Sequence, residues 1–139
     1  MRTLLAALLL ACSHLALAQQ PAPPEVQKAV REVVQAQLDA FQADDAARAF
    51  ALATPGIRET FGNAATFMAM VQQAYPAVYR PKTVAFEPAV LVDGEVVQAV
   101  RLTDQEGRAW IAIYPMQRQP DGSWKTNGCQ LARLSGTQT

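Results

Sequence analysis

The chain has 139 residues, and its 12 basic side chains balance its 12 acidic ones, so its formal net charge at neutral pH is zero. Half of its residues are hydrophobic and 17% are charged, a composition that excludes a disordered polyelectrolyte and is typical of a single packed domain. A neutral chain without a basic run gives no electrostatic reason to expect nucleic-acid binding.

The first segment predicts export. Arg2 precedes an apolar run from Leu4 to Cys12, and Ala16-Leu17-Ala18 has the small-residue pattern of a signal-peptidase site. The run is far shorter than the ~20 apolar residues that a membrane-spanning helix needs. We therefore expect residues 1–18 to be a signal peptide cleaved after Ala18, which leaves a periplasmic or secreted protein without a transmembrane segment.

A second interpretation of the same leader is a lipoprotein signal. Leu9-Leu10-Ala11-Cys12 loosely resembles a lipobox, and lipidation of Cys12 would anchor the protein to a membrane. The apolar core before Cys12 is very short and Leu10 is a poor residue for the middle of that motif, so we favour soluble export. The proline-rich residues 19–24 that follow are expected to be a linker.

The next segment predicts a long amphipathic helix. Between Val26 and Phe41 apolar residues recur at steps of three and four, with charged and polar residues between them. This spacing predicts a helix over residues 25–43, and Pro24 is well placed at its start.

Three further helical segments follow it. Asp44 or Asp45 can cap a short helix that ends at Thr54-Pro55, and another turn is expected over residues 57–61. Asn63 can begin a third main helix, which Pro76 stops. The first half of the domain is therefore expected to be helical.

From Thr83 onward the pattern predicts strands. β-Branched and aromatic residues dominate, and Asp93-Gly94, Glu106-Gly107 and Asp121-Gly122 mark turns between them. Connections this short require antiparallel neighbours. The expected strands span residues 83–92, 95–103, 108–119 and 123–134. Pro115 in the third strand and Pro88 in the first predict bulges or bends that curl the sheet.

Few reactive side-chain types would remain in the chain after cleavage. Its only histidine, His14, lies in the leader, so imidazole-dependent catalysis and metal binding are excluded, and we expect no metal site and no cofactor. Cys129 would be the only remaining cysteine, which excludes an internal disulfide. We interpret Cys129 as a small buried hydrophobe in a strand; a reactive thiol or an intermolecular bridge is the alternative.

Several segments together carry a family resemblance. They are Gln37–Phe41 with Asp44–Ala46, Thr54–Ile57, Phe67–Val71, Tyr75–Pro81, and Arg118–Lys125 leading to Gly128-Cys129. With these segments the chain resembles, from about Val26 to Leu134, the bacterial family of domain of unknown function 4864 (DUF4864). Members are typically exported, and no activity comes with the family.

The predicted elements also resemble a known layout. Three N-terminal helices packed on a curved four-stranded antiparallel sheet, with the long first helix in the concavity, is the arrangement of the nuclear transport factor two-like (cystatin-like) cone. The resemblance implies an α+β fold and says little about function. We expect one cone domain over residues 25–134 and a polar tail over residues 135–139.

Two sets of residues are candidates for a site. Tyr75, Tyr79 and Arg80 lie in a proline-bounded loop, where the rings could grip an apolar ligand and Arg80 could pair with its carboxylate; alternatively, the tyrosines plug one end of the core. In an enzyme acting on a small hydrophobic substrate, Asp39 would be a general base and Tyr114 or Tyr75 a hydrogen-bond donor; alternatively, Asp39 is a solvated surface carboxylate.

These observations predict a non-catalytic domain that binds a small apolar ligand or a protein partner through its cone cavity or its sheet face. An outer sheet face that leaves Val97, Ala99 and Ile111 uncovered would favour a homodimer that buries it. The enzyme that uses Asp39 is the alternative function.

Overall fold

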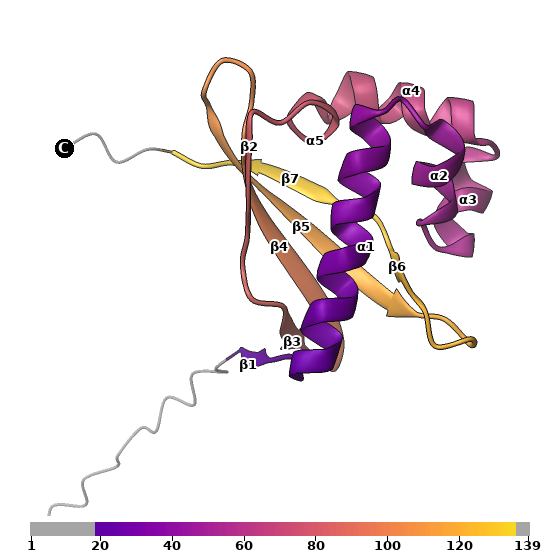
Figure 1. The fold of residues 1–139 in the computed structure, drawn as a ribbon, viewed down its shortest axis with the longest axis vertical. Helices are drawn as coiled ribbons and strands as arrows, with labels where there is room; N and C mark the ends of the chain where they lie inside the picture. The colour runs from indigo at the N-terminus through magenta and orange to yellow at the C-terminus, as the bar shows by residue number, and fades with distance from the viewer. Residues whose placement is uncertain (1–18, 136–139) are drawn as a thin grey trace, which may run out of the picture.

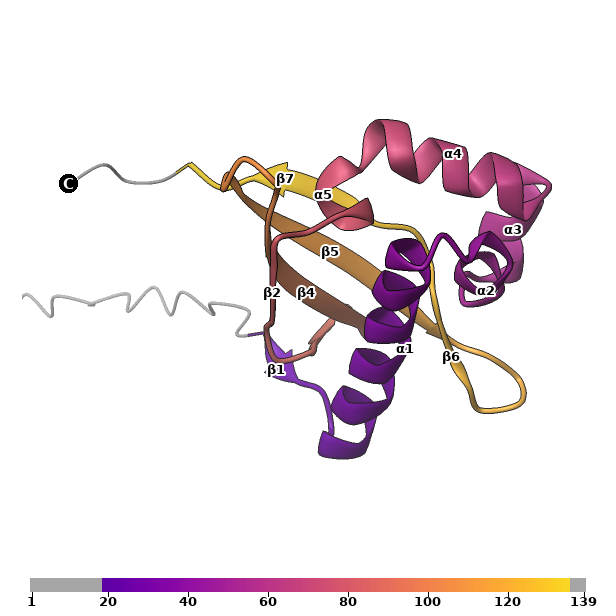
Figure 2. The same ribbon diagram turned by 45° about the horizontal axis from the view of Figure 1, so that its top comes forward.

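The computed structural model describes residues 19–135, in which helices cover one face of a seven-stranded sheet (Figure 1). The long helix α1 (Pro24–Gln42) crosses that face, and four shorter helices gather beyond its C-terminal end (Figure 2). The strands all follow the helices in the chain except β1 (Gln20–Pro21). The fold is therefore α+β, as predicted.

The first helix follows from its residue spacing. Pro24 stands in its first turn, where the missing N–H costs nothing. Its buried residues recur on one stripe that faces the sheet. They are Val30, Val34, Gln37, Leu38, Ala40 and Phe41. The observed bounds differ by one residue at each end from the predicted 25–43.

Side-chain caps begin the next three helices. The carboxylate of Asp45 accepts a hydrogen bond from the Arg48 backbone N–H at 3.1 Å and begins α2 (Ala46–Ala51). Thr54 begins α3 (Pro55–Phe61), and Asn63 begins α4 (Ala64–Ala74). Each of these caps satisfies an amide that has no partner within its own helix.

A fifth helix differs from the expectation of three main helices. Pro76 ends α4, as predicted, but its fixed φ also suits the first turn of a new helix. The segment therefore continues as α5 (Pro76–Tyr79), in place of the loop expected there. Helix α3 falls where a helical turn over residues 57–61 was expected, so α5 is the helical segment that the pattern of apolar residues did not indicate.

The central hairpin of the sheet consists of β4 (Glu95–Thr103) and β5 (Ala109–Arg118). Two short strands, β2 (Thr83–Phe86) and β3 (Val90–Val92), both pair with β4. Two others, β6 (Trp124–Thr126) and β7 (Gln130–Arg133), both pair with β5. All of these pairs are antiparallel, as predicted, but each outer strand of the expected four is broken into two.

Each break is a β-bulge. Opposite the two β4 residues between Val97 and Val100, the outer strand has the three residues 87–89, with Pro88 at their centre. Opposite Tyr114 and Pro115 of β5, it has the three residues 127–129. Proline cannot donate to the ladder, and an extra residue bends a strand. Both bulges flank the buried cross-strand pair of Gln98 and Tyr114. The two outer strands are therefore interrupted at the same position along the central hairpin.

The residues expected to form a linker instead join the domain. Gln20 and Pro21 pair with Leu91 and Val90 at the edge of the sheet. Ala22 is 2% exposed, and its N–H donates to the Ala89 carbonyl at 2.9 Å. The free edge of β3 offers unpaired backbone groups, and a passing segment that supplies partners for them is held there.

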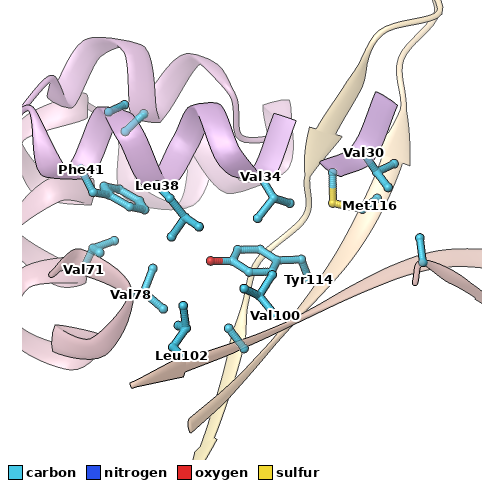
Figure 3. Packing of buried hydrophobic residues seen from close by; sticks show 14 of the residues in the cluster. Val30, Val34, Leu38, Phe41, Val71, Val78, Val100, Leu102, Tyr114 and Met116 are labelled. Carbon is cyan, nitrogen blue, oxygen red and sulfur yellow. The ribbon is translucent and has the colours of Figure 1, made fainter. Parts of the chain in front are cut away.

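The main core lies between α1 and the inner face of the sheet. Val34 and Leu38 of α1 point toward Tyr114, and Val30 lies beside Met116 (Figure 3). The inner face carries alternate residues of β4 and β5, because successive side chains of a strand point to opposite sides. These residues are Val96, Gln98, Val100, Leu102, Ala112, Tyr114 and Met116, and all are buried.

Candidate functional site

An apolar cavity of about 280 Å³ lies between the helices and the inner face of the sheet. We call it the helix–sheet cavity. Its walls come from α1, from α3 and α4, from the start of α5, and from the bulge that follows β6. The residues that line it are Gln37, Phe41, Ala53, Ile57, Thr60, Phe61, Phe67, Met70, Val71, Tyr75, Val78, Tyr114, Thr126, Gly128 and Cys129.

The cavity exists because one wall packs loosely. Helix α3, which supplies Ile57, Thr60 and Phe61, has no fully buried residue. Across from it, Gly128 adopts a φ of +91°, and the place where a Cβ would stand is 3.8 Å from the Ile57 Cδ1 atom. A short helix facing a glycine at a bulge leaves space that larger side chains would otherwise fill.

Aromatic rings form much of the helical wall. The Phe67 ring lies 6.1 Å from that of Phe41 and 5.6 Å from that of Phe61, measured between centroids. Both pairs are tilted or edge-to-face, the arrangements that aromatic rings favour. Phe67, Met70 and Val71 of α4 all line the cavity.

Among the described residues that line the cavity, only Tyr114 has a buried polar side-chain atom without a hydrogen-bond partner. Its side chain is 2% exposed, and its hydroxyl has no hydrogen-bond partner of normal geometry within residues 19–135. Its polar neighbour is the Cys129 thiol, which is only a weak partner. The hydroxyl points from β5 into the space between the sheet and the helices (Figure 3). Buried polar groups are nearly always paired, so one that is not calls for a reason.

Burial governs the ionisation of both titratable groups at the cavity floor. It raises the pKa of Tyr114 well above its usual value, with the neighbouring Cys129 as a smaller cause. It also raises the pKa of Cys129 to about 12, although contact with Tyr114 partly opposes the shift. Both groups therefore keep their protons at neutral pH, and Cys129 is not an activated nucleophile there.

The polar groups around the cavity are neutral. None of the described residues that line it is acidic or basic. Gln37 is 3% exposed and its amide donates to the Ala49 carbonyl at 3.0 Å, which ties α1 to α2. The site therefore offers apolar surface and hydrogen bonds, and no ionic partner for a charged ligand.

The three residues predicted to act together as a ligand site are divided by the structure. Tyr75 lines the cavity, but Tyr79 and Arg80 do not. The Arg80 guanidinium lies 4.0 Å from the centre of the Tyr79 ring and 3.0 Å from the Asp44 carboxylate. It also donates to the Phe41 carbonyl at 2.6 Å, so it binds the C-terminal end of α1.

Asp39 lies apart from the cavity. Its side chain is exposed and accepts a hydrogen bond from the Gln35 amide at 2.9 Å. Helix α1 turns Leu38 and Phe41 inward and Asp39 outward, as the spacing of one amphipathic helix requires. The structure therefore does not bring Asp39 and Tyr114 together.

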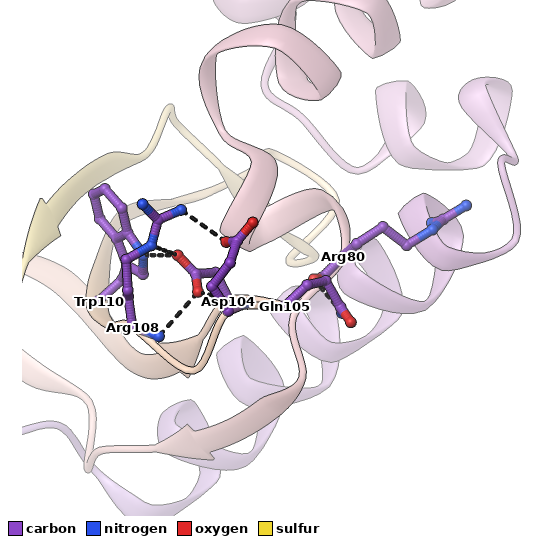
Figure 4. A network of polar contacts seen from close by, with 6 residues as sticks. Arg80, Asp104, Gln105, Arg108 and Trp110 are labelled. Atoms are coloured by element: carbon purple, nitrogen blue, oxygen red, sulfur yellow. Dashed lines mark hydrogen bonds and ion pairs between the residues drawn. The ribbon is translucent and has the colours of Figure 1, made fainter.

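A second polar cluster, at the turn between β4 and β5, was missed by sequence reasoning (Figure 4). The Asp104 carboxylate accepts from the Glu106 and Arg108 backbone N–H groups, from the Arg108 side chain at 2.7 Å and from the Trp110 indole at 2.9 Å. An aspartate three residues before a glycine at a turn could have signalled the backbone contacts. Nothing in the spacing indicated the contact with Trp110.

These bonds decide the ionisation of Asp104. Burial would raise the pKa of this carboxyl, but hydrogen bonds from Trp110 and Arg108, together with the charge of Arg108, hold the pKa well below its usual value. All four donors that face the Asp104 carboxylate are bonded to it. The cluster therefore holds the hairpin turn together.

The outer face of the sheet is the second surface of interest. Val97, Ala99 and Ile111 all lie on the face opposite the helices and are half-buried. The homodimer predicted through these residues stays a prediction, which sedimentation at high concentration would test. Within residues 19–135 no helix is both long and apolar enough to cross a membrane.

The fold and the cavity together define a small α+β domain with a neutral, apolar pocket between helices and sheet. A family described as a domain of unknown function (DUF4864) matches residues 24–139, so the chain belongs to this family. Searches among curated proteins and among solved structures found no match.

Proposed function

We propose that this protein is an exported, non-catalytic domain that binds a small apolar molecule in the helix–sheet cavity. The observation that carries the proposal is the cavity of about 280 Å³, walled by apolar side chains and floored by a buried hydroxyl without a partner. Ligand pockets have this character: a mostly apolar lining with a few polar groups that orient the ligand.

The fold assignment belongs to the same proposal. We propose a nuclear transport factor two-like cone, supported by α1 lying across the inner face of the sheet and by two bulges that bend it. In such a cone the space between helix and sheet is the natural place for a ligand, which agrees with the position of the cavity.

A titration with cumene, a small neutral aromatic hydrocarbon, tests the binding function. We expect saturable shifts of the NMR signals of cavity residues such as Val71 and Tyr114, and a higher melting temperature with cumene present. Val71→Phe, which fills the cavity from α4, should abolish binding. Val84→Phe, at an exposed strand position, is the matched control and should leave binding intact. Equal binding by both variants would contradict the proposal.

Export is tested separately. The proposal is supported by the leader sequence, residues 1–18, which lies outside the described residues. In a bacterial host expressing the full chain, we expect the periplasmic fraction to contain a protein whose mass begins at Gln19. A lipidated species beginning at Cys12 would establish the anchored alternative, and Cys12→Ser distinguishes the two because it blocks lipidation alone. An uncleaved cytosolic product would contradict both.

The enzyme alternative has no observation in its favour. The candidate base Asp39 is exposed on α1, away from the cavity that Tyr114 lines. A general base must reach the proton that it removes, directly or through one water molecule. Binding without turnover is therefore the function that the geometry supports best.

A further inference from the structure

We infer that the ligand of the helix–sheet cavity is an uncharged aromatic molecule that carries a hydrogen-bond acceptor, such as a ketone or ester carbonyl, and that the Tyr114 hydroxyl donates to it. This inference rests on the proposed function and names the chemical class of the ligand. Three features of the site carry it: an unpaired donor, the absence of charge in the lining, and the aromatic wall.

The donor is the Tyr114 hydroxyl. Burial of a hydroxyl without a partner costs free energy that a ligand acceptor would recover. The neighbour at the cavity floor, Cys129, cannot recover it, because a thiol is only a weak acceptor. A ligand acceptor at this end of the cavity would complete the one hydrogen bond that the described fold leaves unmade there.

The charges near the site argue for a neutral ligand. Arg80 is paired with Asp44, and the Lys125 ammonium donates to the Ala51 carbonyl at 2.6 Å, so both cations have partners elsewhere. Arg58 of α3 has a buried Nε without a partner but does not line the cavity. A carboxylate or an ammonium group inside the cavity would lose its hydration without gaining an opposite charge.

The size and shape of the wall favour a single aromatic ring. Phe41, Phe61 and Phe67 present tilted ring faces and edges, against which a further ring can pack edge-to-face. The cavity measures about 280 Å³. With ~30 Å³ for each water-sized group, it holds roughly ten non-hydrogen atoms, which is the size of a substituted benzene.

Four probes of equal non-hydrogen atom count test the inference: acetophenone, cumene, benzoate and benzamidinium. Dissociation constants are measured by NMR titration on the full chain, on Tyr114→Phe, and on Tyr79→Phe, whose lost hydroxyl lies outside the cavity. We expect Tyr114→Phe to weaken acetophenone relative to cumene by about three- to tenfold, the range for one neutral hydrogen bond. Tyr79→Phe should leave that ratio unchanged.

A measurement on the unaltered protein does not depend on any variant folding. The ¹³C signal of the bound acetophenone carbonyl should lie downfield of its position in a hydrocarbon solvent, because a carbonyl carbon moves downfield when it accepts a hydrogen bond. A bound signal at the hydrocarbon position, or the same acetophenone-to-cumene ratio in the unaltered protein and in Tyr114→Phe, would overturn the inference.

The remaining outcomes separate the inference from the function on which it rests. Tighter binding of benzoate or benzamidinium than of both neutral probes would overturn the neutral class while leaving a ligand site. If cumene binds but acetophenone does not, the acceptor is wrong and the cavity function survives. If no probe shifts any cavity signal, the proposed function fails together with the inference.

Discussion

Asp104 and Tyr114 are both buried polar side chains of the central hairpin, and the fold treats them in opposite ways. The Asp104 carboxylate at the turn accepts four hydrogen bonds from Glu106, Arg108 and Trp110. The Tyr114 hydroxyl, farther along β5, has no partner and faces an apolar cavity. A satisfied polar cluster stabilises the fold, whereas an unsatisfied group beside open space is the feature on which the proposed ligand site rests.

The largest expected effect concerns the thiol beside Tyr114. Because burial raises the pKa of Cys129 to about 12, its thiolate fraction near pH 8 should be roughly a thousandfold below that of an ordinary cysteine. Reaction with Ellman's reagent should therefore be slow in the folded protein and fast in denaturant. Peptide mass spectrometry separates Cys129 from Cys12. Equal rates in both conditions would mean that the cavity floor is open to water.

The next largest effect concerns the stability that the hydrogen bonds of Asp104 provide. Asp104→Ala leaves the Trp110 indole and two backbone N–H groups without their acceptor, so we expect the melting temperature to fall on the order of 10 °C. Glu59→Ala, on an exposed position of α3, is the control and should change it little. A fall no larger than that of the control would show that the cluster does not stabilise the hairpin.

Acid should weaken the same cluster. The folded-state pKa of Asp104 lies below its unfolded value of ~3.9, so its contribution to stability is complete above about pH 4 and is lost progressively as the pH falls toward the folded-state pKa. Urea midpoints measured between neutral pH and pH 2 should drop more steeply in the unaltered protein than in Asp104→Asn. Parallel curves would assign the acid sensitivity to other carboxylates.

The smallest expected effect is on the stability of Tyr114→Phe, and its sign is opposite to that of Asp104→Ala. Tyr114→Phe removes a hydroxyl that has no partner, so we expect the free energy of unfolding to stay the same or to rise by about 1 kcal/mol. Tyr79→Phe, which loses bonds to Gln72 and Asp44, should lower it slightly. Chemical denaturation measures both. A clear loss of stability in Tyr114→Phe would mean that the hydroxyl is paired in solution.

Local signals in the sequence predicted much of the fold. The spacing from Val26 to Phe41 predicted α1 to within a residue at each end, because periodicity acts over a few neighbouring residues. Asn63 predicted one helix start and the Asp44-Asp45 pair another, which the structure assigns to Asp45. Pro88 predicted the bulge in its own strand, since a missing N–H interrupts a ladder. The bulge predicted at Pro115 lies instead in the neighbouring strand, at residues 127–129, and β5 continues through Pro115. The pairing of Gln20 and Pro21 with β3 could not be predicted, because it depends on an edge left free by residues far along the chain.

The candidate site likewise has features that the sequence predicts and features that depend on tertiary packing. The sequence by itself determined that Leu38 and Phe41 would lie on the apolar stripe of one helix and that residues 19–139 would contain no imidazole, because spacing and composition belong to the chain alone. Only the tertiary structure decided that Tyr75 lines the cavity while Tyr79 and Arg80 bind the end of α1. It also decided that Asp104 is paired and Tyr114 is not. Whether a buried group finds a partner depends on how completely distant elements fill the space between them, and no local pattern encodes that space.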